Sequence, residues 1–150
     1  MKKQTLLITL AFLIIMVGCK SIKNNDEISN SSKEMLKESL YQTKWSLIKL
    51  GSQKPKFSNE NIKITLQFNK ENSYASGYSG CNRYNGKYET KNNTLSFGNF
   101  ISTKMACPEE NMKIEDNFLK TLPKTNNFEI IGDTLLLKNK ERTIMVFIAE

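Results

Sequence analysis

The stretch NIKITLQF, residues 61–68, alternates apolar and polar side chains along its whole length. Ile62, Ile64, Leu66 and Phe68 fall on one side of an extended chain, and the polar residues between them fall on the other. A strand with one buried and one wetted face is typical of antiparallel sheets. The sequence therefore predicts an antiparallel sheet that includes this strand.

Further strands are predicted on both sides of this segment. KWSLIKL, residues 44–50, begins with alternating apolar residues and changes phase at Ile48, which indicates a β-bulge or a buried end. Clusters of asparagine and glycine, which tolerate the positive φ of tight turns, divide residues 73–97 into short segments. This part of the chain is expected to form a meander of short strands.

The C-terminal residues 126–150 read as three more strands, separated by GD and KNKER. The last of them contains the apolar run IMVFIA. We expect Ile144, Val146 and Ile148 to face the core.

Residues 107–123 have a different period. Pro108 suits the first turn of a helix, and Ile114, Phe118 and Leu122 repeat every four residues. One principal helix is therefore predicted among about seven or eight strands, without a βαβ rhythm. The expected fold class is mainly β (α+β), a small antiparallel barrel with this helix packed on it. A further short helix is predicted within residues 31–42, which open with a capping-box spacing.

The N-terminus carries the pattern of an export signal. Two lysines precede an apolar run at residues 6–17, which is shorter than the roughly 20 residues that span a bilayer. MVGC, residues 16–19, resembles the lipobox of bacterial lipoproteins, in which the cysteine is acylated and becomes the first mature residue. Cys19 is the predicted lipidation site, with palmitate among its expected acyl chains. An ordinary signal peptide and an uncleaved anchor remain alternatives.

Three parts of the chain follow from this pattern: a signal peptide at 1–18, a lipidated tether at 19–40 and a folded domain at 41–150. The residues just after Cys19 are almost all polar, which is typical of a flexible linker. What is known of lipoprotein sorting makes an aspartate after the cysteine the usual inner-membrane signal, and this chain has Lys20 there. We therefore expect a lipid-anchored protein of the cell envelope, at the outer membrane of a Gram-negative bacterium.

Composition argues against several classes of function. The chain has no histidine, which excludes Ser-His and Cys-His nucleophiles and removes the usual nitrogen ligand of zinc. The net charge of +7 is spread over dispersed lysines, so nucleic-acid binding is not expected. No cofactor loop, metal site or catalytic residue is predicted. The helix has four carboxylates that could serve glycoside cleavage, and a solvated helix face is the simpler interpretation of them. They are Glu109, Glu110, Glu115 and Asp116.

With Cys19 assigned to lipid, Cys81 and Cys107 remain. An even number of cysteines outside the cytosol is most simply a disulfide, so this pair is predicted to be bonded. The two residues lack the C-x-x-C spacing of redox catalysts.

Two motifs around these cysteines are similar to a known family. GCNRYNGKY at 80–88 and FISTKMACPEE at 100–110, together with a W-x-L strand at 45–47 and the helix, resemble the META domain of HslJ-like envelope lipoproteins over residues 41–149. The resemblance implies a compact, lipocalin-like barrel with a packed helix, and the family's paired cysteines match the two cysteines here. It also implies a link to heat or antibiotic stress, without an agreed ligand or molecular activity.

The expected function is accordingly that of a non-catalytic lipoprotein that acts through protein contacts. Asn82, Arg83 and Tyr84 are the candidate partner-binding residues, because arginine and tyrosine are favoured in interface hot spots. The structural alternative places Tyr84 on a packed face together with Tyr88. Two other functions stay open: a calycin-like barrel that binds a small apolar ligand, and an inhibitor of a secreted hydrolase.

Overall fold

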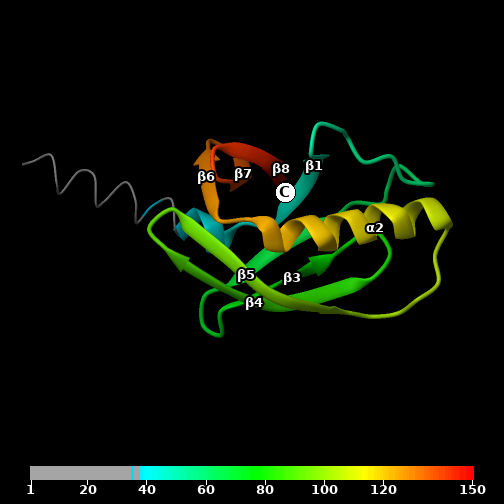
Figure 1. Cartoon of the computed structure of the whole chain (residues 1–150), viewed down its shortest axis with the longest axis horizontal. Helices are drawn as coiled ribbons and strands as arrows, with labels where there is room; N and C mark the ends of the chain where they lie inside the picture. The colour runs from blue at the N-terminus through cyan, green and yellow to red at the C-terminus, as the bar shows by residue number, and fades with distance from the viewer. Residues whose placement is uncertain (1–34, 36–37) are drawn as a thin grey trace, which may run out of the picture.

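The computed structural model describes residue 35 and residues 38–150. The predicted signal peptide, Cys19 and most of the predicted tether lie outside these residues. In the described part, eight strands form one antiparallel sheet that closes into a barrel in chain order (Figure 1). The strands are β1 Trp45–Leu50, β2 Thr65–Asn69, β3 Tyr74–Tyr78, β4 Arg83–Lys91, β5 Thr94–Ser102, β6 Asn127–Ile131, β7 Thr134–Asn139 and β8 Arg142–Ala149. The predicted mainly β barrel is confirmed.

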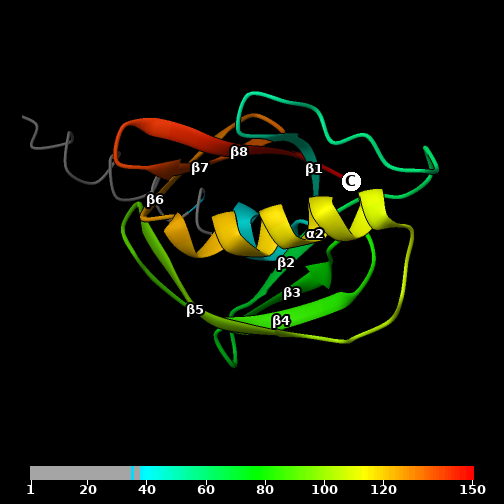
Figure 2. The ribbon, with the colours of Figure 1, turned by 45° about the vertical axis from the view of Figure 1, so that its right-hand side comes forward.

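The ring of strands is weakest between β5 and β6, which pair only at Thr94 and Asn127. The chain that joins these two strands contains the helix α2, Glu109–Thr121, and the short 3-10 helix η1, Leu122–Lys124. In Figure 2, α2 lies between the half of the sheet formed by β1 and β6–β8 and the half formed by β3–β5. The helix thus covers the side where the sheet is least continuous.

The alternating segment at residues 61–68 has the predicted buried face. Ile64, Leu66 and Phe68 are buried, whereas Ile62 precedes the strand and is only half-buried. The predicted bulge in β1 is also present, because the register against β8 shifts between Leu47 and Lys49.

The barrel interior is filled by packed side chains. Its largest fully buried members are Trp45, Tyr84, Phe118, Phe147, Leu40, Ile64, Leu66, Leu95, Leu122, Leu135, Leu137 and Met145. The indole of Trp45 donates a hydrogen bond of 3.2 Å to the carbonyl of Leu40, in the helical residues 38–42. Leu40, which was assigned to the tether, therefore belongs to the folded core.

The helix α2 follows the predicted pattern with slightly narrower bounds than the predicted 107–123. It begins after Pro108, and Glu109 and Glu110 occupy its first turn, where carboxylates complement the helix dipole. Phe118 is fully buried, and its ring packs edge-on against that of Tyr84 at 5.3 Å. Apolar packing of this face fixes the helix to the sheet.

The predicted phase of β8 is wrong. Met145 and Phe147 are the buried residues of this strand, while Ile148 is 42% exposed. Pairing sets this phase, because Phe147 lies opposite Leu47 of β1 and Leu135 of β7, whose side chains point inward. Of the residues that the sequence assigned to the core, Ile148 therefore lies on the outside of the barrel and Val146 is half-buried there, whereas Ile144 is half-buried and packs against the core.

Candidate functional site

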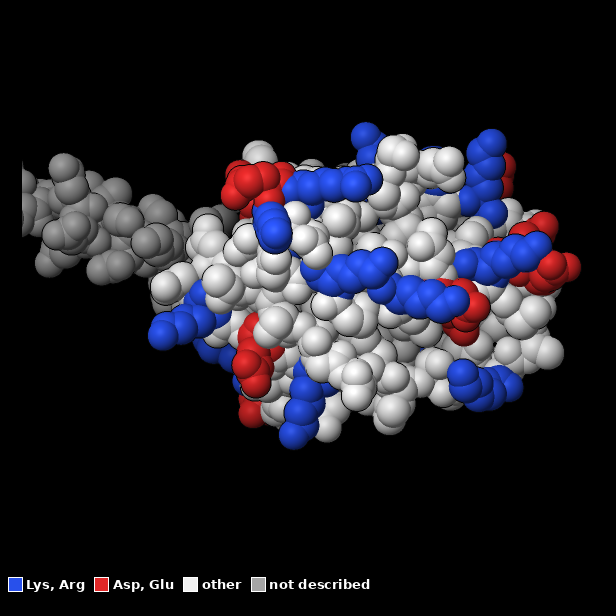
Figure 3. All heavy atoms as spheres, in the orientation of Figure 1, with Lys and Arg blue, Asp and Glu red and all other residues white. Residues whose placement is uncertain are grey.

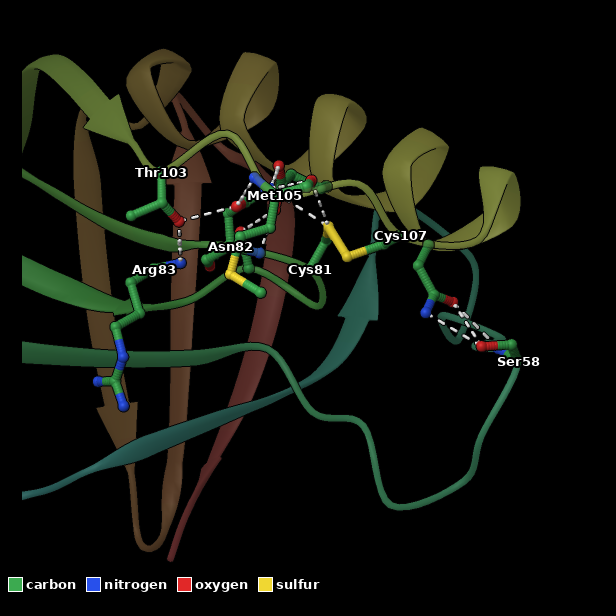
Figure 4. The surroundings of a disulfide bond; sticks show 10 residues. Ser58, Cys81, Asn82, Arg83, Thr103, Met105 and Cys107 are labelled. Carbon is green, nitrogen blue, oxygen red and sulfur yellow. Dashed lines mark hydrogen bonds between the residues drawn. A yellow bond between two sulfur atoms is a disulfide. The ribbon is translucent and has the colours of Figure 1, made fainter.

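The two cysteine motifs meet at one end of α2 (Figure 4). Cys81, in the turn between β3 and β4, is joined by a disulfide to Cys107, just ahead of α2, with 5.9 Å between their Cα atoms. Gly80, which precedes the bond, has φ of +99°, a conformation that favours glycine. The structure thus contains the pair that the sequence predicts.

A buried carboxylate lies under this disulfide. Glu115 of α2 accepts hydrogen bonds from the backbone amide of Asn82 at 2.8 Å, from its side-chain amide at 2.9 Å and from the hydroxyl of Ser79. Only 8% of the residue is exposed. The interpretation of Glu115 as part of a solvated helix face is therefore wrong, because it is the acceptor that ties the β3–β4 turn to the helix.

Asn82 connects this carboxylate to a third segment. Its side-chain oxygen accepts hydrogen bonds from the hydroxyl of Thr103 at 2.7 Å and from the backbone amide of Met105 at 2.8 Å. Asn82 is buried, so it does not project from the barrel rim as the partner-binding hypothesis expected. Its side chain instead satisfies donors and acceptors of two loops at once, which is the usual requirement for a buried amide.

Tyr84 is buried as well, which agrees with the structural alternative for this motif. Its hydroxyl donates to the carbonyl of Thr65 at 2.8 Å, and that of Tyr88 donates to the carbonyl of Asn69 at 3.2 Å. Burial raises the pKa of Tyr84 well above its usual value, and burial, with a smaller effect of Tyr41, raises the pKa of Tyr88 to about 12. Neither phenol is placed to transfer protons near neutral pH.

Arg83 is the one member of the predicted trio that faces solvent, and Figure 4 shows its side chain directed away from the disulfide. It lines a hollow of about 800 Å³ on the outer face of the barrel, together with Lys44, Lys63 and Tyr78. Glu150 lies in the same hollow and forms ion pairs with both lysines. Within the described residues, Arg83 forms no ion pair, so its charge is available to a partner.

The remaining helix carboxylates are exposed. Glu109 pairs with Lys113 at 2.6 Å and Asp116 with Lys120 at 3.6 Å, each one helical turn apart. Figure 3 shows lysines and acids interspersed over this face instead of a field of one sign. No group of three or more potential metal ligands occurs in the described part of the chain.

Together these contacts define a clamp, formed by Ser79, Cys81, Asn82, Cys107 and Glu115. It holds the β3–β4 turn, the loop before α2 and α2 itself together, and its polar atoms are engaged with one another. The sequence located both cysteines, but it gave no role to Ser79 and assigned Glu115 to a solvated helix face. The only local signal for them was their closeness to the cysteine motifs, in SGCN and at the start of EDNFLKTLP.

The sequence profile of the META domain matches residues 38–150. The chain belongs to the META domain family. This META domain is also similar to a protein from Burkholderia xenovorans solved by NMR, with 26% identity and a TM-score of 0.63, over 80% of this chain and 87% of that one. None of the curated proteins matches the chain.

Two further solved structures share the fold of this META domain. One is another NMR structure, with 21% identity, a TM-score of 0.57 and coverage of 74% of this chain and 92% of that one. The other is the crystal structure of a DUF4847 family protein from Bacteroides vulgatus, with 14% identity and a TM-score of 0.55, over 75% of this chain and 95% of that one. Neither the family nor these neighbours indicates an enzyme.

Proposed function

We propose that this chain is a non-catalytic lipoprotein of the bacterial cell envelope whose META domain acts through protein contacts. The observation that carries this proposal is that the side chains of the two cysteine motifs contact one another inside the fold. The disulfide and the carboxylate of Glu115 are engaged inside the clamp, so the motifs stabilise the fold and leave no free nucleophile or base there. What the domain offers to other molecules is its outer surface.

The Arg83 hollow is the surface that best suits a protein partner. Arginine is enriched in interface hot spots, and the guanidinium can bind a carboxylate through two parallel hydrogen bonds. The neighbouring Tyr78 adds an amphipathic ring, and Lys44 and Lys63 are already engaged with Glu150. The partner segment should therefore supply an acidic side chain to Arg83.

We also propose that Cys19 is lipidated, which would keep this surface near a membrane. Support comes from the N-terminal order of lysines, apolar run, glycine and cysteine. In the described residues, no helix has the length and apolarity to cross a bilayer. With Lys20 after the cysteine, we propose the outer membrane as the site, and a contribution to stress or antibiotic tolerance as the role.

The packed interior argues against a ligand inside the barrel. Trp45, Phe68 and Phe147 occupy the space that a calycin would leave for its ligand, and each is less than 5% exposed. We therefore favour protein contacts over the barrel-ligand alternative.

Photo-crosslinking in intact cells tests the proposal. A photoreactive residue at Asn85, which lines the Arg83 hollow, should give a discrete adduct with an envelope protein. Arg83→Glu should lower the yield at least tenfold, because it brings like charges together at the contact. Arg142→Glu is the matched control, since Arg142 is exposed and is the only other arginine of the chain, and it should leave the yield within about twofold.

The tolerance role needs a separate readout. Cells that lack the protein should lose survival under heat or antibiotic stress, and the wild-type chain should restore it, whereas Arg83→Glu and Cys19→Ala should not. No adduct at Asn85, at rest and under stress alike, would count against protein contacts. An adduct with unchanged survival would remove the tolerance role alone.

A further inference from the structure

The outer face of β8 and β1 is unusually apolar for a wetted sheet surface. Ile148 is 42% exposed, and Val146 and Ile48 are half-buried on the same side of the barrel. An antiparallel strand with one wet face normally alternates with polar residues, whereas apolar residues on both faces indicate that both are covered. In the sequence, this outer face shows as the apolar residues Val146 and Ile148, which the alternation in β8 wrongly assigned to the core.

This face forms the floor of a hollow of about 1160 Å³. Ile48 and Ile148 lie at the floor, and the opposite wall comes from the segment 54–63, with Phe57 and Ile62 as its larger apolar residues. Figure 1 shows the chain between β1 and β2 leaving the barrel and returning to it. The hollow is thus bounded by the sheet on one side and by this segment on the other.

The wall is held in place by two contacts. The backbone amide of Ser58 donates to the side-chain oxygen of Asn111 at 3.1 Å, and the side-chain amide of Asn111 donates back to the hydroxyl of Ser58 at 3.0 Å. The ring of Phe57 packs on Gly80 so closely that a Cβ there would lie 2.5 Å from it. The hollow is therefore preformed, as ligand sites usually are.

The rim of the hollow is basic. Lys54, Lys56 and Lys63 line it, with Glu60 and Glu150 as the acidic residues. Glu150 is neutralised by its ion pairs with Lys44 and Lys63. Within the described residues, Lys54 and Lys56 form no ion pair, so two free ammonium groups line the rim beside the side-chain carboxylate of Glu60.

We propose that this hollow binds one anionic amphiphile, with its acyl chain against Ile48, Ile62 and Ile148 and its headgroup beside Lys54 and Lys56. The volume exceeds the roughly 300–1,000 Å³ of typical ligand pockets, so a long acyl chain fits. The segment 54–63 walls the hollow on one side, and a flat bilayer surface cannot enter it. The ligand is therefore a single molecule and not a membrane surface.

The site is separate from the barrel interior, and it does not depend on the proposed partner contact. It shares Ile62, Lys63 and Glu150 with the Arg83 hollow at their common rim. Ile48 and Ile148 line only the amphiphile site, and Arg83 lines only the other. Failure of either proposal can therefore be recognised without the other.

Isotope-labelled isoleucine methyl groups locate the ligand directly. We would titrate residues 20–150, which lack the lipidation site, with dodecanoate below its micelle-forming concentration. The whole barrel and the segment 54–63 lie within residues 38–150, and the Burkholderia relative was solved in solution by NMR. The methyl signals of Ile48, Ile62 and Ile148 should shift, and that of Ile131, which is exposed on β6 outside the hollow, should not.

The chemistry of the ligand is tested by varying it. Each methylene taken out of water changes a binding constant about fourfold, so octanoate should bind at least tenfold more weakly than dodecanoate. Dodecyltrimethylammonium, with the same chain and the opposite charge, should also bind at least tenfold more weakly. Vesicles of phosphatidylglycerol should not reproduce the shifts, because their acyl chains are held in the bilayer.

Two pairs of variants complete the test. Ile148→Glu should weaken dodecanoate binding at least tenfold, whereas Ile131→Glu, the same change at an exposed isoleucine elsewhere, should leave it unchanged. The double variant Lys54→Glu, Lys56→Glu should weaken dodecanoate binding to a similar extent. The control is the double variant Lys91→Glu, Lys140→Glu, which should leave binding unchanged. Four results would each overturn the proposal: equal binding of the cationic amphiphile, shifts confined to interior isoleucines such as Ile64, equal effects of both isoleucine variants, or shifts with vesicles. So would the absence of any methyl shift in a chain whose spectrum is that of a folded protein.

Discussion

Replacing Glu115 with alanine is expected to lower the free energy of unfolding by about 3–5 kcal/mol. The carboxylate accepts three hydrogen bonds from Ser79 and Asn82 in a buried site. Without it, these donors stay buried and unpaired, and each unpaired group costs about 1–3 kcal/mol. Urea denaturation followed by the fluorescence of the single tryptophan, Trp45, measures the loss.

Asp116→Ala is the matched control for this prediction. It removes a carboxylate from the next position of the same helix, where the pair with Lys120 is exposed. An exposed pair of this kind contributes about 0–1 kcal/mol. Glu115→Gln, which keeps one acceptor oxygen, should fall between the two. If Glu115→Ala and Asp116→Ala were equally mild, the clamp would not hold the fold as described.

Removing the disulfide, by Cys81→Ser with Cys107→Ser, should cost about 3.5 kcal/mol of stability. The bond closes a loop with a sequence separation of 26 residues and therefore restricts the unfolded chain. It also joins the β3–β4 turn to the loop before α2, and Glu115 joins the same turn to α2 itself. Thermal and urea unfolding of the variant and of the oxidised wild-type chain give the difference directly.

Coupling between the two parts of the clamp supplies a further check. Cys81 is adjacent to Asn82, whose amide donates to Glu115, so removing the disulfide and the carboxylate together should give a non-additive loss. Combining the cysteine variant with Asp116→Ala should be additive within about 0.5 kcal/mol. A cysteine variant within about 1 kcal/mol of the wild type would show that the bond is not needed to brace the barrel.

The parts of the fold that could be predicted from the sequence have a clear period. In β2, burial of one face requires alternation, and Leu66 and Phe68 follow it. From α2 into η1, the spacing of Phe118 and Leu122 is that of one helical face. Once Cys19 was assigned to lipid, only Cys81 and Cys107 were left to pair, and they are bonded.

Other features could not be predicted, because they depend on contacts far apart in the sequence. In sequence, Glu115 looks like its exposed neighbour Asp116. The residues that donate hydrogen bonds to its carboxylate, Ser79 and Asn82, lie 36 and 33 residues away. In β8 both faces are apolar, so periodicity does not choose between Met145 and Val146. Only the pairing with β1 and β7 decides which face is inside.

The hollow on the outer face could not be predicted as a site either, although the apolar outer residues of β8 are visible in the sequence. Its wall comes from segment 54–63 and its floor from β1 and β8, which adjoin only because these strands close the barrel. Arg83 was identified correctly as a solvent-facing side chain, but its neighbours Asn82 and Tyr84 are buried. Three consecutive residues in such a turn and strand point in different directions, so the sequence alone did not separate them.

The most direct test of the central claim is mass spectrometry of the protein purified from its native envelope without reduction. If the chain is an exported, lipid-anchored domain braced by its motif cysteines, the first residue should be Cys19 carrying acyl chains. A linked pair of peptides should contain Cys81 and Cys107. An unmodified Cys19 behind an intact leader, together with free thiols at the other two cysteines, would contradict the account.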